Sequence, residues 1–311
     1  MEQFFSTFSA RTIWTPELIV VLVIISFFYF MITGPWRHKF PGSEPVKVSR
    51  KIYFHLGLIC IYFGFGGPLY VLGHLMLSMH MLSMAITYFI APPLLLLGTP
   101  SWFFRWLGNI RVIKGIFVVL GVPIIGLVLF NAMISFYHLP QMFDRFLTNE
   151  GWHNAYQLAM LGAALMMWWH VIPRMKTKRE LSDLKKMGYM FAGSVLITPA
   201  CVLIIFAGEP LYETYTNPAV WAAAISYCLP AGADIPYEIF TTGDQTIALL
   251  TPLQDQQLGG VMMKVIQELV YSAAIGYIFA LWMRSDKAST DKLDVELKEY
   301  EMVNQKNVTE A

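Results

Sequence analysis

The stretch that decides the fold is residues 79–98, which read MHMLSMAITYFIAPPLLLLG. It contains no Asp, Glu, Lys or Arg, and its length matches the roughly 20 apolar residues that an α-helix needs to cross a bilayer. Six other stretches are similarly long and predominantly apolar, at residues 16–33, 52–72, 114–136, 152–172, 187–207 and 259–283, so the sequence predicts an all-α polytopic membrane protein with seven transmembrane helices. An eighth apolar run, residues 219–231, is too short to cross, and we expect it to lie on the membrane surface.

The overall composition supports this fold class. Charged residues make up 14% of the 311 positions and hydrophobic residues 56%, whereas a soluble globular chain carries roughly 25% charged residues. So few charges cannot cover a water-exposed surface, and a formal net charge of +1 offers no basic surface for nucleic acid. The composition therefore excludes a soluble enzyme, a disordered chain and a nucleic-acid-binding protein. Cys60, Cys201 and Cys228 show no paired spacing that would indicate a disulfide framework or a zinc site.

Lysine and arginine fall almost entirely on one side of the predicted bundle. Of the 22 such residues, 19 lie in the loops 34–51, 98–114 and 173–186 or in the tail 284–311. Because cytoplasmic segments retain Lys and Arg, this asymmetry predicts an amino terminus outside, a carboxyl terminus inside and a multi-pass location in the cell membrane. We expect residues 1–283 to form the transmembrane domain and the remainder to form a charged cytoplasmic tail.

Four of the seven histidines fall at the outer ends of the predicted helices. His74 lies in the connection between the second and third spans, and His80 opens the third span. His138 closes the fourth span and His153 opens the fifth. Asp255 comes just before the seventh span, at the same level of the membrane. Different helices therefore present potential metal ligands at one depth.

Methionine sulfur accompanies these histidines. Met76 and Met84 each lie four positions from His80, which places them on one face of a helix that begins early enough. Imidazole together with thioether suits Cu(I), whereas magnesium or calcium calls for an oxygen cluster and zinc for thiolates or three histidines. Histidines at helix ends are also common as hydrogen-bonded interfacial residues, and methionine is a common packing residue. The residues alone leave a copper site and a polar outer cavity as alternatives.

Two further pairs of polar residues have two interpretations each. His55 and His170 lie near the inner ends of different spans, where they could ligate a haem axially or sit at the membrane interface. Lys264 and Glu268 are four positions apart in the seventh span, so they share a helix face and can neutralise one another. That ion pair could lock a helix interface or take part in ion handling.

Three blocks resemble motifs of the CtaG-type cytochrome c oxidase assembly family of Gram-positive bacteria, and the composition resembles that of its Bacillus member. The blocks occur in the family's order over roughly residues 50–285. They are His80 with the run Ala91–Pro100; His138-Leu139-Pro140 with Phe143-Asp144, Trp152-His153 and Trp168-Trp169; and Asp255-Gln256-Gln257-Leu258-Gly259-Gly260.

The resemblance implies a factor, without turnover of its own, that is needed to form an active caa-type haem–copper oxidase. His80, His138, His153 and Asp255 match positions in the family's motifs. Relatives commonly carry a second histidine four residues after the positions of His80 and His153. This sequence has Met84 and Gln157 there. Methionine keeps copper chemistry plausible, whereas glutamine is a poor metal ligand.

We therefore expect an assembly factor that holds Cu(I) near the outer membrane surface and passes it to the catalytic subunit of the oxidase or to another assembly factor. The expected donors are His80, His138 and His153, with sulfur from Met84 or Met76, and with His74 nearby. Asp255 is expected to accept a ring N–H or to act as an entry-site charge. The alternatives are a metal-free chaperone for oxidase subunits and a haem-handling membrane protein.

Overall fold

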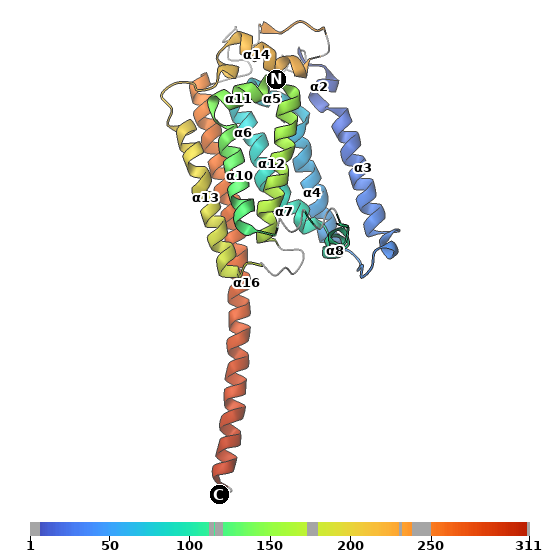
Figure 1. The fold of residues 1–311 in the computed structure, drawn as a ribbon, viewed down its shortest axis with the longest axis vertical. Helices are drawn as coiled ribbons and strands as arrows, with labels where there is room; N and C mark the ends of the chain where they lie inside the picture. The colour runs from blue at the N-terminus through green and yellow to red at the C-terminus, as the bar shows by residue number, and fades with distance from the viewer. Residues whose placement is uncertain are drawn as a thin grey trace.

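The computed structural model describes residues 7–111, 115, 121–172, 180–229, 232–237 and 250–309, and gives only the backbone course for 288–295 and 297–309. All regular structure in these residues is helical, which confirms the predicted all-α class. Figure 1 shows a bundle of roughly parallel helices, with one helix, α3, standing at its edge.

Among the described residues, five helical segments are long and apolar enough to cross a membrane, so the chain is a multi-pass membrane protein. They coincide with five of the predicted spans. Ala10–Thr33 contains α2 (Ala10–Trp14) and α3 (Pro16–Thr33), and Val48–Leu75 contains α4 (Val48–Phe65) and α5 (Gly67–Leu75). Leu77–Gly98 contains α6 (Leu77–Ala85), the π-helical turn η2 (Ile86–Ile90) and α7 (Ala91–Gly98). The fourth segment is α13 (Asp183–Ile205). The fifth is Pro252–Lys287, which is part of α16 (Pro252–Thr309).

The other two predicted spans have a different form. The described part of span 114–136 is α10 (Pro123–Tyr137), which reaches a crossing length only together with α11 (Pro140–Leu147), and these two helices are bent by 80°. Residues 114 and 116–120 of that prediction lie outside the described residues. The part of the chain that the structure describes thus has five candidate spans, or six if the bent pair counts as one.

The prediction for residues 152–172 corresponds to α12 (Glu150–Val171), a helix of 22 residues that is not among the candidate spans. Polar side chains lower its hydropathy, and three of them, His153, Gln157 and His170, are buried. In the view of Figure 1, α12 lies between α10 and α4, and its second half is largely buried, whereas one face of its first half is exposed. A helix that packs against protein needs less apolar surface than one that faces lipid, so hydropathy alone underestimates such a helix.

Close backbone approaches hold the bundle together. Gly98, at the end of α7, lies so near α4 that an added Cβ would overlap the backbone nitrogen of Phe54. Tyr29 of α3 stacks on Phe54 at 3.9 Å between ring centroids and donates a hydrogen bond of 3.0 Å to the Gly98 carbonyl. Small residues at helix interfaces allow this kind of packing in membranes. The contact joins α3, α4 and α7 at one end of the bundle.

The two ends of the bundle differ. At one end lie the described start of the chain, α11 and the short helix α14 (Pro218–Ile225), which together with the turn η4 (Ser226–Cys228) occupies the predicted surface run 219–231. Trp221 and Ile225 of α14 pack with Phe8, Ile13 and Val71 in a small core of their own. At the other end lie α8 (Ser101–Gly108) and the point where α16 leaves the bundle and continues as a single helix (Figure 1).

Candidate functional site

The structure gathers the four predicted histidines at one end of the bundle, which we call the histidine end. His74 ends α5, His80 lies in the first turn of α6, His138 follows α10 and His153 lies in the first turn of α12. All four side chains are buried. His74, His138 and His153 all lie near enough to His80 to interact with it electrostatically. The structure thus brings these four side chains into one group, and their role as metal ligands stays a prediction.

Tyr137, the last residue of α10, lies at the centre of this group. Its ring is parallel to that of His80 at 5.7 Å between centroids, and it contacts His138 at 5.4 Å and His153 at 6.3 Å. The His74 and His153 rings are 6.0 Å apart. Sequence reasoning missed Tyr137, although its position directly before His138 could have indicated it.

Hydrogen bonds to the backbone fix the protonation of two rings. The Nδ1 atom of His138 donates to the Ile134 carbonyl at 2.6 Å, and Nδ1 of His74 donates to the Tyr70 carbonyl at 3.0 Å. A carbonyl oxygen can only accept, so the proton of each neutral ring is on Nδ1 and the lone pair is on Nε2. Metal-bound histidines are oriented in this way. Both rings therefore have a free lone pair on the nitrogen that commonly ligates metals.

Two of these nitrogens are buried without a partner. Among the described residues, none forms a hydrogen bond with Nε2 of His80 or with Nε2 of His138. A buried polar atom that lacks a partner costs about 1–3 kcal/mol. Native proteins avoid this cost unless water, a ligand or a metal satisfies the atom. The histidine end thus holds two buried ring nitrogens without a partner among the described residues, and the one on His138 is a lone pair.

His153 differs, because both of its ring nitrogens are engaged. The Gln157 amide, one helical turn along α12, donates to Nε2 at 2.7 Å. Since that nitrogen accepts, the ring proton is on Nδ1 and donates to the Tyr137 hydroxyl at 3.3 Å. His153 could bind a metal only by exchanging the Gln157 contact.

Asp255 is buried and positions α6. Its carboxylate accepts a hydrogen bond of 3.2 Å from the backbone N–H of Ser78 and another from the Ser78 hydroxyl. Met76, the residue before α6, has no side-chain capping bond, so a carboxylate from α16 takes the place of the missing cap. These contacts fix the start of the helix that carries His80. Within the described residues Asp255 accepts no histidine N–H, and its role as an entry-site charge stays a prediction.

The two predicted methionines flank His80 along the chain. Met84 is 2% exposed and lies one turn after His80 in α6, inside the core of the bundle. Met76 is partly buried, and its carbonyl accepts the His80 backbone N–H at 3.2 Å. Within the described residues, no group of three or more His, Cys, Asp or Glu side chains is arranged to hold a metal ion. Any metal would therefore rely on fewer histidines, on sulfur, or on a rearrangement.

A family model for the cytochrome c oxidase caa3 assembly factor (Caa3_CtaG) matches residues 27–285, which include the end of α3, every described helix from α4 to α14, and α16 as far as residue 285. The chain belongs to this family. No curated protein and no solved structure matched it. The match supports the predicted family, and nothing places the chain nearer to its Bacillus member than to any other.

In this assembly factor a segment between α13 and α14 crosses the histidine end. The Tyr212 hydroxyl donates to the His138 carbonyl at 3.0 Å, and the Tyr215 hydroxyl donates to the Gly73 carbonyl at 2.7 Å. Burial raises the pKa of both phenols, and the nearby Asp144 carboxylate adds to the shift, so both remain protonated donors. Asp144 also accepts hydrogen bonds from the Thr214 backbone N–H at 2.9 Å and from its hydroxyl at 2.6 Å.

The motif that follows Asp255 in the assembly factor also has a packing role. Gln256 accepts a hydrogen bond of 2.7 Å from the Leu211 backbone N–H and donates to the Ile204 carbonyl at 3.3 Å. A Cβ on Gly259 would lie 3.1 Å from Ser78 of α6. The motif thus fixes α16 against α6 and α13, which supports the end of the bundle where the histidines meet.

The second histidine pair of the assembly factor makes separate contacts. His55 bonds through Nε2 to the Ser26 hydroxyl at 2.9 Å and through Nδ1 to the Lys51 carbonyl at 2.7 Å. His170 packs its ring against Tyr189 of α13, 6.0 Å away. The two rings therefore face different helices, α3 and α13, which does not favour axial ligation of one haem.

Proposed function

We propose that this caa3 assembly factor binds copper at the histidine end, as Cu(I), and assists its delivery to the catalytic subunit of the oxidase. The observation that carries the proposal is the pair of buried, unpartnered Nε2 atoms on His80 and His138. Imidazole nitrogen near thioether sulfur is the donor combination that suits Cu(I). His80 and His138 would hold the ion, Met84 or Met76 would add sulfur, and His74 and His153 lie within the same group of rings.

A small number of donors suits delivery. An ion that must leave for another protein needs ligands that bind it and also release it, and the described residues offer no closed cage of three ionisable ligands. His153 can join only by exchanging Gln157, so its bond to copper would compete with an existing hydrogen bond. This competition would weaken the site and favour transfer.

The proposal includes a topology of seven transmembrane helices in the cell membrane, with the histidine end outside. α12 would be the crossing helix that hydropathy does not detect, because it carries the buried polar side chains of His153, Gln157 and His170. The basic residues of α8 and of the segment before α4 lie at the opposite end, which is the arrangement expected for a cytoplasmic face. The partner would then receive copper on the outer side.

A second candidate function is a scaffold for oxidase subunits that binds no metal. The observation that favours it is the complete hydrogen bonding of His153, which needs no ion to be satisfied. On this view ordered water would satisfy His80 and His138. The two candidates differ in whether the purified protein retains copper.

Copper content decides between them. The purified protein is loaded with Cu(I) under reducing conditions, dialysed and analysed for metal beside the triple variant His80→Ala, His138→Ala, His153→Ala. The matched control is His55→Gln, which changes a histidine outside the group. Copper should fall in the triple variant and persist in the control, whereas equal copper in all three proteins would contradict the site. In cells that lack the protein, an oxidase that contains haem but no copper would indicate delivery rather than scaffolding.

A further inference from the structure

An ion pair lies in the middle of the longest candidate span. Lys264 and Glu268 of α16 are 2.6 Å apart, and Glu268 is 16 residues from Pro252 and 19 from Lys287, the two ends of that span. At 1.5 Å per residue, Glu268 is about 24 Å along the helix from Pro252. Intramembrane charges are rare because the hydrocarbon core penalises them, and those that occur commonly serve a function.

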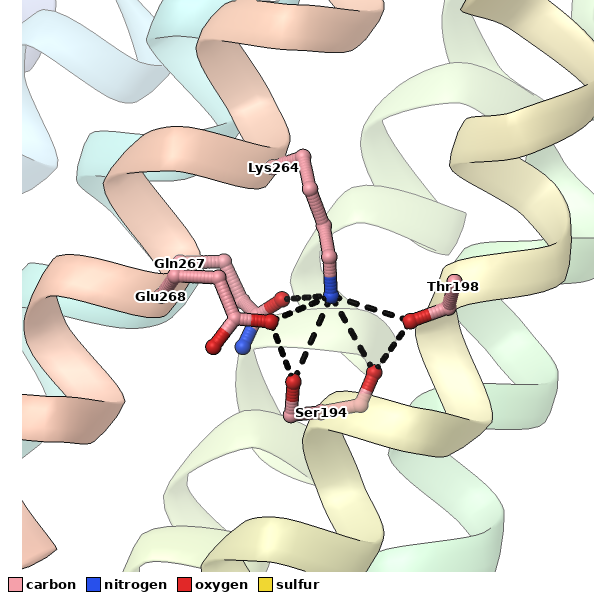
Figure 2. Close-up of polar contacts among 5 residues, drawn as sticks. All are labelled: Ser194, Thr198, Lys264, Gln267 and Glu268. Atoms are coloured by element: carbon pink, nitrogen blue, oxygen red, sulfur yellow. Dashed lines mark hydrogen bonds and ion pairs between the residues drawn. The ribbon is translucent and has the colours of Figure 1, made fainter.

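α13 completes the polar group, as Figure 2 shows. The Lys264 amine donates to the Thr198 hydroxyl at 3.0 Å, to the Ser194 carbonyl at 3.2 Å and to the Gln267 side-chain oxygen at 2.9 Å. These oxygens, with one oxygen of Glu268, surround the ammonium group. Lys264 is therefore satisfied within the protein.

Glu268 is satisfied on one side only. The Ser194 hydroxyl and Lys264 both contact its Oε1 atom, and in Figure 2 the second carboxylate oxygen points away from them. The Glu268 side chain is 45% exposed, compared with 22% for Lys264. The seam between α13 and α16 thus presents a hydrogen-bond acceptor on the outer surface of the bundle at mid-span, where lipid tails offer no donor.

We propose that this seam is the docking site for a transmembrane helix of another protein, one that carries a neutral hydrogen-bond donor, a hydroxyl, amide or indole, at the depth of Glu268. Lys264 already neutralises the charge of the carboxylate, so a neutral donor matches the remaining acceptor better than a cation does. The proposal does not depend on copper. It assigns a surface for contact with another membrane protein to a chain whose family acts in oxidase assembly.

A second copy of this chain does not fit the seam. Two copies in one membrane have the same orientation, so a two-fold interface centred here would place Glu268 at the same depth as Glu268 of its neighbour. Two carboxylates at one depth would repel and would supply no donor. The surface beside Glu268 is open to a foreign helix, since the neighbouring Leu269 is 66% exposed.

Site-specific photo-crosslinking tests the docking site in the full-length protein, co-expressed with the subunits of a caa3-type oxidase. Benzoylphenylalanine replaces Leu269, which is beside Glu268 and 66% exposed, or Leu158 of α12, which is 65% exposed and serves as the matched control. Position 269 should form an adduct that mass spectrometry assigns to a transmembrane segment of an oxidase subunit, and position 158 should form lipid adducts only.

Charge variants then test the acceptor. The double variant Glu268→Leu, Lys264→Met removes both charges together and should lower the adduct yield at 269 roughly threefold to thirtyfold, the effect of one interhelical hydrogen bond in a membrane. Glu268→Gln keeps an acceptor oxygen and should retain the adduct. The unfolding temperature and the copper content of each variant are measured on the same samples.

Equal adducts at the two positions, lipid adducts alone, or an adduct between two copies of this chain would overturn the docking site. So would a double variant that folds and retains the full yield. If the unaltered protein binds no copper but forms the adduct at position 269, the copper site alone is contradicted. If it binds copper but forms no such adduct, the docking site alone is contradicted.

Discussion

The carboxylate of Asp255 binds both the backbone N–H and the hydroxyl of Ser78, a residue 177 positions earlier in the chain. The start of α16 thereby caps the start of α6, and α6 carries His80. An acidic group at a helix N-terminus satisfies exposed N–H groups and interacts favourably with the helix dipole. The contact couples the placement of the last helix to the geometry of the histidine end.

Removing this cap should destabilise the protein and disturb the site. Asp255→Ala leaves two buried donors of Ser78 unpaired, and we expect a loss of about 1–3 kcal/mol in the free energy of unfolding. Ser78→Ala should cost less, because the backbone bond remains. A double-mutant cycle in detergent, followed by thermal unfolding, measures the coupling. Additive effects of the two substitutions would contradict a direct bond.

The Gln157 side chain should regulate the availability of His153. Gln157→Leu removes the donor to Nε2, so the lone pair becomes free and the affinity for Cu(I) should increase, while the metal-free protein loses about 1 kcal/mol of stability. A competition titration with a Cu(I) chelator measures the affinity. Asn154→Leu changes an exposed residue of the same helix and should leave the affinity unchanged.

Asp144 should hold the segment that covers the histidine end. Asp144→Ala removes the acceptor for Thr214 and for the Glu213 backbone N–H, at about 1.5–3 kcal/mol for bonds to a charged group. Residues 206–217 should then be cleaved faster in limited proteolysis of detergent-solubilised protein. Gln141→Ala, an exposed change on the same helix, is the control, and equal cleavage rates would show that Asp144 does not fix the segment.

Cys228 should react slowly with maleimide across the physiological pH range. Burial raises the pKa of its thiol from 9.0 to about 12, with a smaller contribution from Glu150, so the reactive thiolate is scarce at pH 8. Because the shift is upward, labelling of the folded protein should increase only as the pH approaches 12, whereas denatured protein should label near pH 9. Cys60 and Cys201 are replaced by alanine in both proteins that are compared. In the fast-reacting control Cys228 is replaced as well, and Ser226→Cys supplies an exposed thiol on the same turn.

The contact between Gly98 and Phe54 should be sensitive to a single methyl group. Gly98→Ala forces α4 away from α7, because the new Cβ would overlap backbone rather than a movable side chain. We expect a loss of about 1–3 kcal/mol, the usual range for overpacking. Gly162→Ala, on α12, has no atom within 4 Å of its Cβ and should be neutral or slightly stabilising. Thermal unfolding of both variants in one detergent makes the comparison.

Local patterns of the sequence determined the helical class, the positions of α3 and α13, and the gathering of four histidines at one end; α16 begins at Pro252, seven residues before the predicted seventh span. Hydropathy over about 20 residues is a property of a single segment, so it needs no knowledge of neighbours. The same reasoning is incomplete for α12, where His153, Gln157 and His170 lower the hydropathy although they are buried. It also missed the 80° bend between α10 and α11.

Only the tertiary structure decided what each site residue does. Nothing near Asp255 in the sequence indicates Ser78 as its partner, and nothing near His153 indicates that Tyr137 completes its hydrogen bonds. Which histidine keeps a free lone pair depends on donors and acceptors that distant helices bring together in space. The sequence alone could therefore predict that histidines meet at one end of a membrane bundle, but the packing of the helices determined that two of them lack a partner there.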